Sequence, residues 1–365
     1  MLLTFFVLYN TIYILIDFWS NMKGTVKKKK MKPLVKLGVI LASIVLFFGI
    51  ILGGAIGYFR LSVNSYYLAS QTAFLIPGLN DGYIPQGLCY DDKSQTFILS
   101  GYKNNHSPSP VYLVKNGELV KSVTLLTPEK KDYTGHGGGI DIGGDYVYLA
   151  GGGDCCIYVY SYSDLMSAKD GDKLSCLGKI PLLVSETDYL GNAFVTVVGD
   201  RLITGEFYRD GNYPTLDTHK ITTSAGNYNQ ALALEYKLDP SKEFGVDLTP
   251  IKAYSMPDLV QGFTIYDGKI YLSTSWGLSF SNIYEYDQSK LTKQKDITVL
   301  GSTVPLYALD STSLTASYKI APMSEEIVFV EGLLYVNCES ASNKYIFGKF
   351  TGGQYLYKTD LSKMK

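Results

Sequence analysis

The stretch QGFTIYDGKIYLSTSWGLSFSNIYEYD, residues 261–287, decides the fold of this chain. It opens with a polar residue beside glycine and continues as a short apolar strand, an Asp267-Gly268 turn, a second apolar strand and a third strand rich in tyrosine. Asp and Gly accept the positive φ angles that tight hairpin turns need. The stretch therefore predicts three consecutive antiparallel strands.

The same order of polar start, strands and turn occurs five times after residue 80. The copies begin at Gln86, His136, Asn192, Gln261 and Glu325, so successive starts lie 50, 56, 69 and 64 residues apart. Repetition at this period, with several strands in each copy, is typical of a radial array of sheets. We therefore predict an all-β fold, a single β-propeller with five blades in residues 72–365.

The two ends of the repeated region are expected to complete each other. The fifth copy reaches Lys365 before a fourth strand, whereas the strand-like residues 72–76 precede the first copy without a partner. If residues 72–76 supply the outer strand of the last blade, the ring closes and no sheet edge stays open. Six blades are the alternative, because the insertions at 208–229 and 287–312 have room for a further blade or for lid loops.

The N-terminal part carries a membrane signal. Residues 37–59 contain no charge, and at about 1.5 Å per residue they can cross a hydrocarbon core of about 30 Å. Lysines at 27–30, 32 and 36 precede them, which predicts a cytoplasmic N-terminal end. The run is too long for an ordinary signal peptide. We expect an uncleaved signal-anchor in the plasma membrane, a stalk at 60–71 and an extracytoplasmic propeller.

Residues 1–36 leave two interpretations open. Residues 2–19 are apolar but contain Asn10 and Asp17, so they are either a first span of a two-pass hairpin or a stretch that precedes a true start at Met22 or Met31. Both interpretations give a basic cytoplasmic segment and an extracytoplasmic propeller.

The charge is distributed unevenly along the chain. Residues 1–60 hold eight basic residues and one acidic residue, whereas the remainder holds 25 basic and 33 acidic residues. Phosphate contacts need clustered basic residues, so the acidic propeller is not expected to bind nucleic acid. The basic segment fits membrane topology and contact with anionic lipid.

The five cysteines, at 89, 155, 156, 176 and 338, contain no C-x-x-C pair. We interpret them first as small buried strand residues. A bridge from Cys155 or Cys156 to Cys176, and a second from Cys89 to Cys338, are the alternatives.

Several features resemble a known group of proteins. The start Pro85-Gln86-Gly87, the glycine-containing hairpin turns and the tyrosine-rich third strands resemble bacterial exported propellers of the YncE-like and gluconolactonase-like kind, over roughly residues 72–362. The resemblance implies a propeller fold and export. The calcium-dependent lactonases of this kind hold their metal with acidic and Asn residues in the channel, and that set has no residue-by-residue match here.

The propeller geometry selects candidate ligand residues. The start of each first strand and the end of each second strand lie on the same face, because the two strands are antiparallel. Nine polar or aromatic residues occupy these positions and form the composition of a ligand pocket. They are Gln86, His136, Asn192, Glu206, Gln261, Ser275, Trp276, Glu325 and Glu339.

The candidates are compatible with several kinds of chemistry. Glu206, Glu325 and Glu339 could bind Ca²⁺ through oxygen ligands, act as an acid and base pair, or close the ring through hydrogen bonds. Trp276 and Tyr208 could form an aromatic platform for a sugar or peptide, or either could be a packing residue. His106 and His219 lie in polar, loop-like sequence and are expected to be exposed.

The HGGG run at 136–139 is found in esterases, but the G-x-S-x-G elbow is absent from this sequence. We therefore expect a membrane-anchored module that binds an extracellular ligand or protein. A hydrolase or lyase of the lactonase or glycosidase type, with or without Ca²⁺, is the alternative.

Overall fold

A computed structural model describes residues 33–364 of the chain, which divides into two compact units at Ala55 and Ile56. Helix α2 (Pro33–Leu61) contains the segment Ile40–Leu61, whose mean hydropathy is 2.5 and which buries no residues. Among the described residues it is the one helix long and apolar enough to cross a membrane. It overlaps the span predicted at 37–59.

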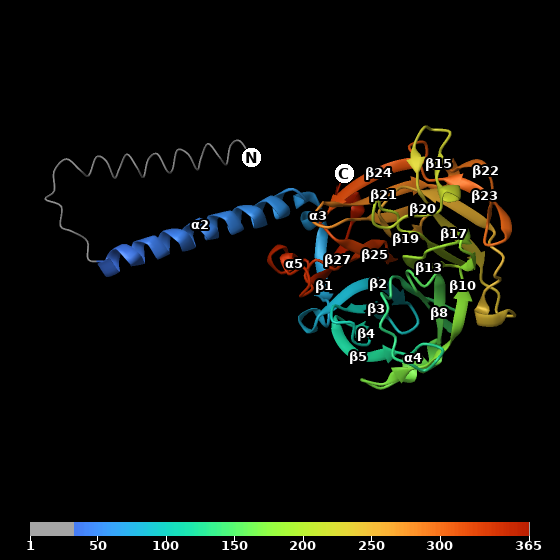
Figure 1. Ribbon diagram of the computed structural model, residues 1–365, viewed down its shortest axis with the longest axis horizontal. Helices are drawn as coiled ribbons and strands as arrows, with labels where there is room; N and C mark the ends of the chain where they lie inside the picture. Colours follow the sequence, from blue (N-terminus) through green and yellow to red (C-terminus); the bar gives the residue numbers. More distant parts are fainter. Residues whose placement is uncertain (1–32, 365) are drawn as a thin grey trace. The chain divides into compact units, whose positions relative to one another are not determined.

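The second unit is a five-bladed β-propeller, as the repeat predicted (Figure 1). Each blade is an antiparallel sheet whose strands run from the axis outward. The inner strands are β2 (Tyr83–Asp91), β6 (Ile140–Gly143), β13 (Phe194–Val198), β19 (Val260–Tyr266) and β25 (Ser324–Val330). The second strands are β3 (Thr96–Lys103), β7 (Tyr146–Ala150), β14 (Arg201–Gly205), β20 (Lys269–Thr274) and β26 (Leu333–Cys338).

The third and outer strands complete the blades. The third strands are β4 (Pro110–Lys115), β8 (Cys156–Ser161), β17 (Ala231–Lys237), β21 (Ser281–Asp287) and β27 (Tyr355–Thr359). The outer strands are β5 (Glu118–Leu125), β10 (Cys176–Pro181), β18 (Lys252–Met256), β24 (Leu314–Ile320) and β1 (Ser70–Leu75). Neighbouring inner strands contact each other all around the axis, so the ring is continuous.

Strand β1 closes the ring. It pairs antiparallel with β27, from Ser70 opposite Thr359 to Leu75 opposite Tyr355, and Figure 1 shows the blue strand beside the red one. Phe74 of β1 is buried with Leu79 and Leu356 in one hydrophobic cluster. The prediction that the N-terminal strand supplies the missing outer strand of the last blade is therefore confirmed.

The insertion at 287–312 forms a hairpin of β22 (Thr292–Val299) and β23 (Ser302–Ala308) rather than a sixth blade. Strand β23 pairs in parallel with β18, so the hairpin widens the neighbouring third blade to six strands. The remaining short strands are β9 (Lys173–Leu174), β11 (Leu183–Ser185), β12 (Asp188–Tyr189), β15 (Ile221–Thr222) and β16 (Tyr228–Asn229). The five-blade prediction holds and its six-blade alternative does not.

Short helices occupy connections between strands. They are α3 (Asn64–Ala69), α4 (Tyr162–Ser167) and α5 (Phe347–Thr351), with 3-10 turns η1 (Leu79–Asp81), η2 (Asp217–His219), η3 (Glu243–Gly245), η4 (Gln288–Lys290) and η5 (Leu361–Met364). The segment predicted as a stalk is packed instead, because Val63 and Tyr66 beside and within α3 are 1% exposed. Both pack against Ile320 and Val336 of the propeller.

The hydrophobic core lies mainly between neighbouring blades. One cluster joins Ile98 and Leu113 of the first blade to Leu149 and Tyr158 of the second. Strand residues with large apolar or aromatic side chains fill these spaces, which explains the excess of tyrosine. All five cysteines lie in the described part of the chain and none is disulfide-bonded, so the bridges considered from the sequence are not formed.

Glycine permits the close approach of chains at the axis. A Cβ at Gly138 would clash with the carbonyl oxygen of Ala193, and one at Gly139 would lie 2.6 Å from Oε2 of Glu326. Any side chain at these positions would displace the neighbouring backbone or the glutamate. The glycine run at 137–139 is therefore explained by packing.

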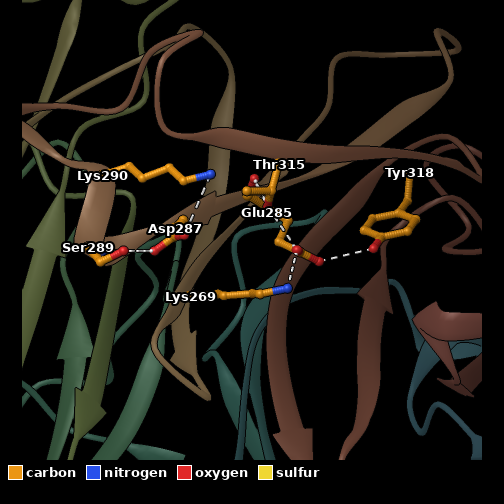
Figure 2. A network of polar contacts seen from close by, with 7 residues as sticks. All are labelled: Lys269, Glu285, Asp287, Ser289, Lys290, Thr315 and Tyr318. Atoms are coloured by element: carbon orange, nitrogen blue, oxygen red, sulfur yellow. Dashed lines mark hydrogen bonds and ion pairs between the residues drawn. The ribbon is translucent and has the colours of Figure 1, made fainter.

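A polar network holds the fourth blade together away from the axis (Figure 2). The Glu285 carboxylate of β21 accepts hydrogen bonds from Lys269 Nζ at 2.5 Å, Thr315 Oγ1 at 2.8 Å and Tyr318 Oη at 3.0 Å. Burial alone would raise the pKa of Glu285, but these donors hold it below its ordinary value. The adjacent Asp287 accepts from the backbone N–H of Ser289 at 2.9 Å and caps η4.

Candidate functional site

A cavity of about 590 Å³ opens at one end of the propeller axis. Its size lies within the range of small-molecule sites. Eight of the nine candidate residues line it, because the starts of the inner strands and the ends of the second strands meet at this face. These eight are Gln86, His136, Asn192, Gln261, Ser275, Trp276, Glu325 and Glu339.

Glu206, the ninth candidate, is absent from the cavity lining. Its side chain is buried inside the third blade, where its two oxygens each lie 3.0 Å from His219 Nδ1 and Oε2 accepts a hydrogen bond from Leu232 N at 2.9 Å. The insertion that follows β14 folds back and carries His219 to it. His219 is 2% exposed, so the expectation of an exposed histidine was wrong, whereas His106 is exposed as expected.

The three-glutamate calcium site is therefore not formed. With Glu206 elsewhere, Glu325 and Glu339 remain as a pair, and the described residues contain no group of three or more His, Cys, Asp or Glu side chains placed to hold a metal ion. A Ca²⁺ ion needs six to eight oxygen ligands. The charged groups of the cavity therefore need an explanation other than a calcium site made of Glu206, Glu325 and Glu339.

Glu325 and Glu339 form a coupled pair of carboxyl groups. Gln86 Nε2 donates to Glu339 Oε2 at 3.1 Å, whereas Glu325 Oε1 has no hydrogen-bond partner among the described residues. Burial raises the pKa of Glu339 to about 7, against the opposing charge of Lys344. Burial and the charge of Glu339 raise the pKa of Glu325 well above its ordinary value. The raised pKa favours the protonated form of Glu325, which can donate a hydrogen bond.

Two further acids lie buried near this pair, close to the axis. Glu326 accepts a hydrogen bond from Phe263 N at 3.3 Å, and Asp141 accepts from Val197 N at 2.7 Å and Thr196 Oγ1 at 3.2 Å. Burial raises the pKa of Asp141 to about 7, and burial together with the charge of Asp141 raises that of Glu326. Neither residue was a candidate. Asp141 is the polar residue in an otherwise apolar strand start, which is the signal that marks it.

One wall of the cavity consists of His136, Tyr102 and Lys344. The rings of His136 and Tyr102 stack with centroids 4.2 Å apart, and Lys344 Nζ donates to Tyr102 Oη at 2.8 Å. His136 exposes surface to the cavity, but the surrounding walls displace bulk water and lower its pKa to about 4, with a further contribution from the charge of Lys344. The imidazole is therefore neutral at pH 7.

A second wall is aromatic. The ring of Trp276 lies 6.1 Å from Phe207 and 6.0 Å from Tyr213, and the guanidinium of Arg209 lies 3.9 Å above it. Trp276 belongs to this cluster, whereas Tyr208 takes the packing role that was the alternative to an aromatic platform. Tyr208 packs into the core and is 6% exposed, because adjacent residues of the extended segment point to opposite sides.

Asn192 is the most unusual residue of the cavity. It is 0% exposed by accessible area, yet neither its Oδ1 nor its Nδ2 has a hydrogen-bond partner in the described part of the chain. A buried polar group without a partner costs about 1–3 kcal/mol. The cavity therefore presents an amide whose donor and acceptor are both unused.

Comparison with known proteins finds only distant structural neighbours. No protein-family model and no curated protein matches the sequence. Solved structures similar to this chain include the glutaminyl cyclase of Myxococcus xanthus, with a TM-score of 0.40, 11% identity and coverage of 80% of this chain and 94% of that one. The PQQ-bound aldose sugar dehydrogenase of Streptomyces coelicolor has a TM-score of 0.38 and 16% identity, with coverage of 73% of this chain and 76% of that one. Streptogramin B lyase has a TM-score of 0.37 and 11% identity, with coverage of 79% of this chain and 96% of that one.

These three neighbours are β-propeller proteins. We draw no functional conclusion from similarities at this level. The chain is placed in the class of β-propellers by its own strand order and ring closure.

Proposed function

We propose that this protein is a membrane-anchored extracytoplasmic propeller whose axial cavity binds a small, uncharged, hydroxylated ligand such as a saccharide. The observation that carries the proposal is Asn192, whose amide lines the cavity with both polar atoms unused. When the cavity wall shifts and uncovers this amide, a ligand hydroxyl can donate to Oδ1 and accept from Nδ2, which removes the cost of burying the amide.

The remaining lining supports the same ligand class. The face of Trp276 can pack against the C–H surface of a sugar ring, and Gln261 and Ser275 offer further hydrogen bonds to hydroxyl groups. Burial lowers the pKa of His136 to about 4 and raises that of Glu325 well above its ordinary value, so both groups favour their neutral forms, while Lys344 contributes a cation to the wall. An uncharged polar ligand suits these groups better than an ion.

The cellular part of the proposal rests on residues 27–61. The helix segment Ile40–Leu61 serves as a single-pass anchor, and the preceding lysines hold its N-terminal end in the cytoplasm. The propeller then lies outside the cytoplasm. Membership among the YncE-like and gluconolactonase-like exported propellers is part of this proposal and rests on the sequence resemblance.

The test is calorimetric titration of the full chain in detergent micelles with a panel of mono- and oligosaccharides. Asn192→Leu keeps a similar shape and removes the unused amide, so it should abolish saturable binding while leaving the melting temperature unchanged or higher. Asn229→Leu is the matched control, because Asn229 Nδ2 donates to Ser255 O at 3.0 Å and Leu309 O at 3.1 Å, and its loss should lower the melting temperature. Absence of saturable heat with every saccharide would contradict the proposal.

A hydrolase is the second candidate, and the Glu325–Glu339 pair favours it. Two neighbouring carboxyl groups, one with a pKa raised well above its ordinary value and one with a pKa of about 7, have the pattern of an acid and base pair. Chromogenic aryl glycosides and lactones test this chemistry. Turnover that disappears in both Glu325→Gln and Glu339→Gln would establish it, and binding without turnover would exclude these substrates.

A further inference from the structure

The end of the apolar segment is fixed to two loops of the propeller. Within the unit Ile56–Lys365, Phe59 contacts Phe280 with ring centroids 5.6 Å apart and Phe347 at 4.4 Å. The next residue, Arg60, is the first charged residue after the apolar run, and its Nη1 donates to Thr351 O at 3.0 Å. If the run spans a membrane, these contacts lie at the level where the chain leaves the hydrocarbon core.

The same two loops supply part of the cavity wall. The loop after β20 contributes Trp276 and Gly277, and the loop after β26 contributes Lys344 and Tyr345. Gly277 is three residues from Phe280, and at most about 3.6 Å per residue separates them, so the cavity rim lies within about 11 Å of the anchor contacts. The polar layer of a bilayer is roughly 5–8 Å thick on each side.

The surface around these contacts has the composition of a membrane interface. We define the interfacial patch as the exposed apolar or aromatic residues of these loops and of the anchor end, the half-buried Phe280 between them, and the cations beside them. Its members are Tyr58, Leu278, Phe280, Ile346 and Phe350 with Arg60, Lys319, Lys344 and Lys349. Leu278, Ile346 and Phe350 are 53%, 53% and 52% exposed.

Charge within the patch is of one sign. Lys319 Nζ lies 3.9 Å above the ring of Phe280, and residues 275–280 and 340–354 contain no Asp or Glu. Aromatic residues with Lys and Arg are the combination enriched at membrane surfaces, and the cations attract anionic headgroups. An acidic propeller that carries a basic, apolar patch beside its anchor is suited to contact lipid at this place.

We propose that the interfacial patch rests on the headgroup layer of the bilayer that holds the anchor, so that the cavity opens at the membrane surface and its ligand is the saccharide headgroup of a membrane lipid. This inference rests on the saccharide-binding cavity proposed above. It adds where the ligand comes from: the membrane surface rather than free solution.

Trp276 allows a direct test, because Trp19 is the other tryptophan of the chain. The full chain carrying Trp19→Phe is placed in phosphatidylcholine nanodiscs that contain either a headgroup nitroxide lipid or a lipid labelled near the acyl-chain end. We expect the headgroup label to quench most of the Trp276 emission and the deep label to quench little. Equal, weak quenching by both labels would overturn the inference.

Two comparisons make the result specific. A probe on the opposite face, Tyr266→Trp in a chain that also carries Trp19→Phe and Trp276→Phe, should escape both labels. Ile346→Ser with Phe350→Ser should reduce headgroup quenching of Trp276, whereas Leu119→Ser with Val120→Ser, an exposed pair at the far hairpin of the first blade, should not. Quenching that is insensitive to the patch pair would contradict the patch.

The ligand source is tested with one sugar in two forms. Glucosyldiacylglycerol in nanodiscs is compared with soluble glucosylglycerol added to the same protein. Confinement at the surface should tighten apparent binding by about tenfold or more. Equal affinity for both forms would overturn the lipid-headgroup source while leaving saccharide binding intact, and binding of neither form, with normal quenching, would count against the saccharide ligand itself.

Discussion

Two buried glutamates, Glu285 in the fourth blade and Glu325 at the axis, have the same side chain and opposite surroundings. Glu285 accepts hydrogen bonds from three side chains, and its pKa lies below the ordinary value (Figure 2). Glu325 has an oxygen without a partner among the described residues, and its pKa lies well above the ordinary value. The first arrangement uses all of the bonding capacity of the carboxylate for the fold. The second leaves capacity for a ligand.

The largest expected effect is a difference in unfolding free energy between variants of the two glutamates. Glu285→Leu leaves Lys269, Thr315 and Tyr318 without their acceptor and should cost about 2–4 kcal/mol of unfolding free energy. Glu325→Leu is the matched change, and it removes a buried carboxyl that has an unused oxygen, so it should cost little or nothing. Thermal unfolding of the full chain in micelles measures both. Equal losses of unfolding free energy in the two variants would contradict the distinction between Glu285 and Glu325.

The next effect is a dependence of stability on pH. A carboxyl whose folded pKa lies above its unfolded value is protonated in the folded state and ionised in the unfolded state, so stability is lost as pH rises through this interval. Asp141 and Glu339, with pKa values of about 7, and Glu325 and Glu326, whose pKa values burial raises well above the ordinary value, all act in this direction. The melting temperature should fall by about 5 °C or more between pH 5 and pH 8.

His136 has the opposite effect on the pH dependence of stability, so a variant at this position is a control for the carboxyl groups. Its pKa of about 4 lies below the unfolded value of about 6.5, so its contribution to stability rises with pH between these values. One partly accessible imidazole is outweighed by four buried carboxyls. His136→Gln should therefore steepen the fall in melting temperature, and a flat or rising profile in the unmodified protein would contradict the set of protonated carboxyls.

A smaller effect is expected from Glu325→Gln. The amide keeps the shape of the protonated carboxyl and removes the group that ionises on unfolding. The melting temperature should therefore rise by a few degrees at pH 8, where one pKa unit corresponds to about 1.4 kcal/mol, and should change little at pH 5. Calorimetry at the two pH values measures the difference. A loss of stability at pH 8 would mean that Glu325 holds the ring together.

The smallest effect concerns the neighbouring wall. Lys344→Met removes a positive charge that faces His136, so the pKa of His136 should move up toward its ordinary value. Proton NMR of the three histidines during a pH titration, with His136→Gln to assign the signal, measures this shift. The exposed His106 serves as an internal reference that should not move.

The architecture was accessible from the sequence because the repeat itself carries the information. A Gly/Asp turn fixes each hairpin, and the number of copies indicates the number of blades. The orphan strand before the first copy then completes the last one. The positions that face the axis follow from strand direction, which is why eight candidates line one cavity.

The site residues that the sequence did not predict correctly lie where the chain departs from the repeated strand pattern. Lys344 and Phe207 lie in irregular loops whose path the repeat does not specify, and the same reason explains why Glu206 meets His219. Glu326 was missed because successive strand residues normally face opposite sides, but a register shift between Ser324 and Ile327 lets both glutamates turn inward. Local irregularities of this kind are set by packing in three dimensions.

The pairing of β1 with β27 sets an order of events in biosynthesis. Strand β1 follows the apolar helix closely and is among the first parts of the propeller to leave the ribosome, whereas β27 is the last strand to be made. The edge of β1 therefore stays unpaired until nearly the whole propeller has emerged. If the ribosome stalls before Tyr355, β27 is missing, β1 has no strand to pair with and the ring stays open.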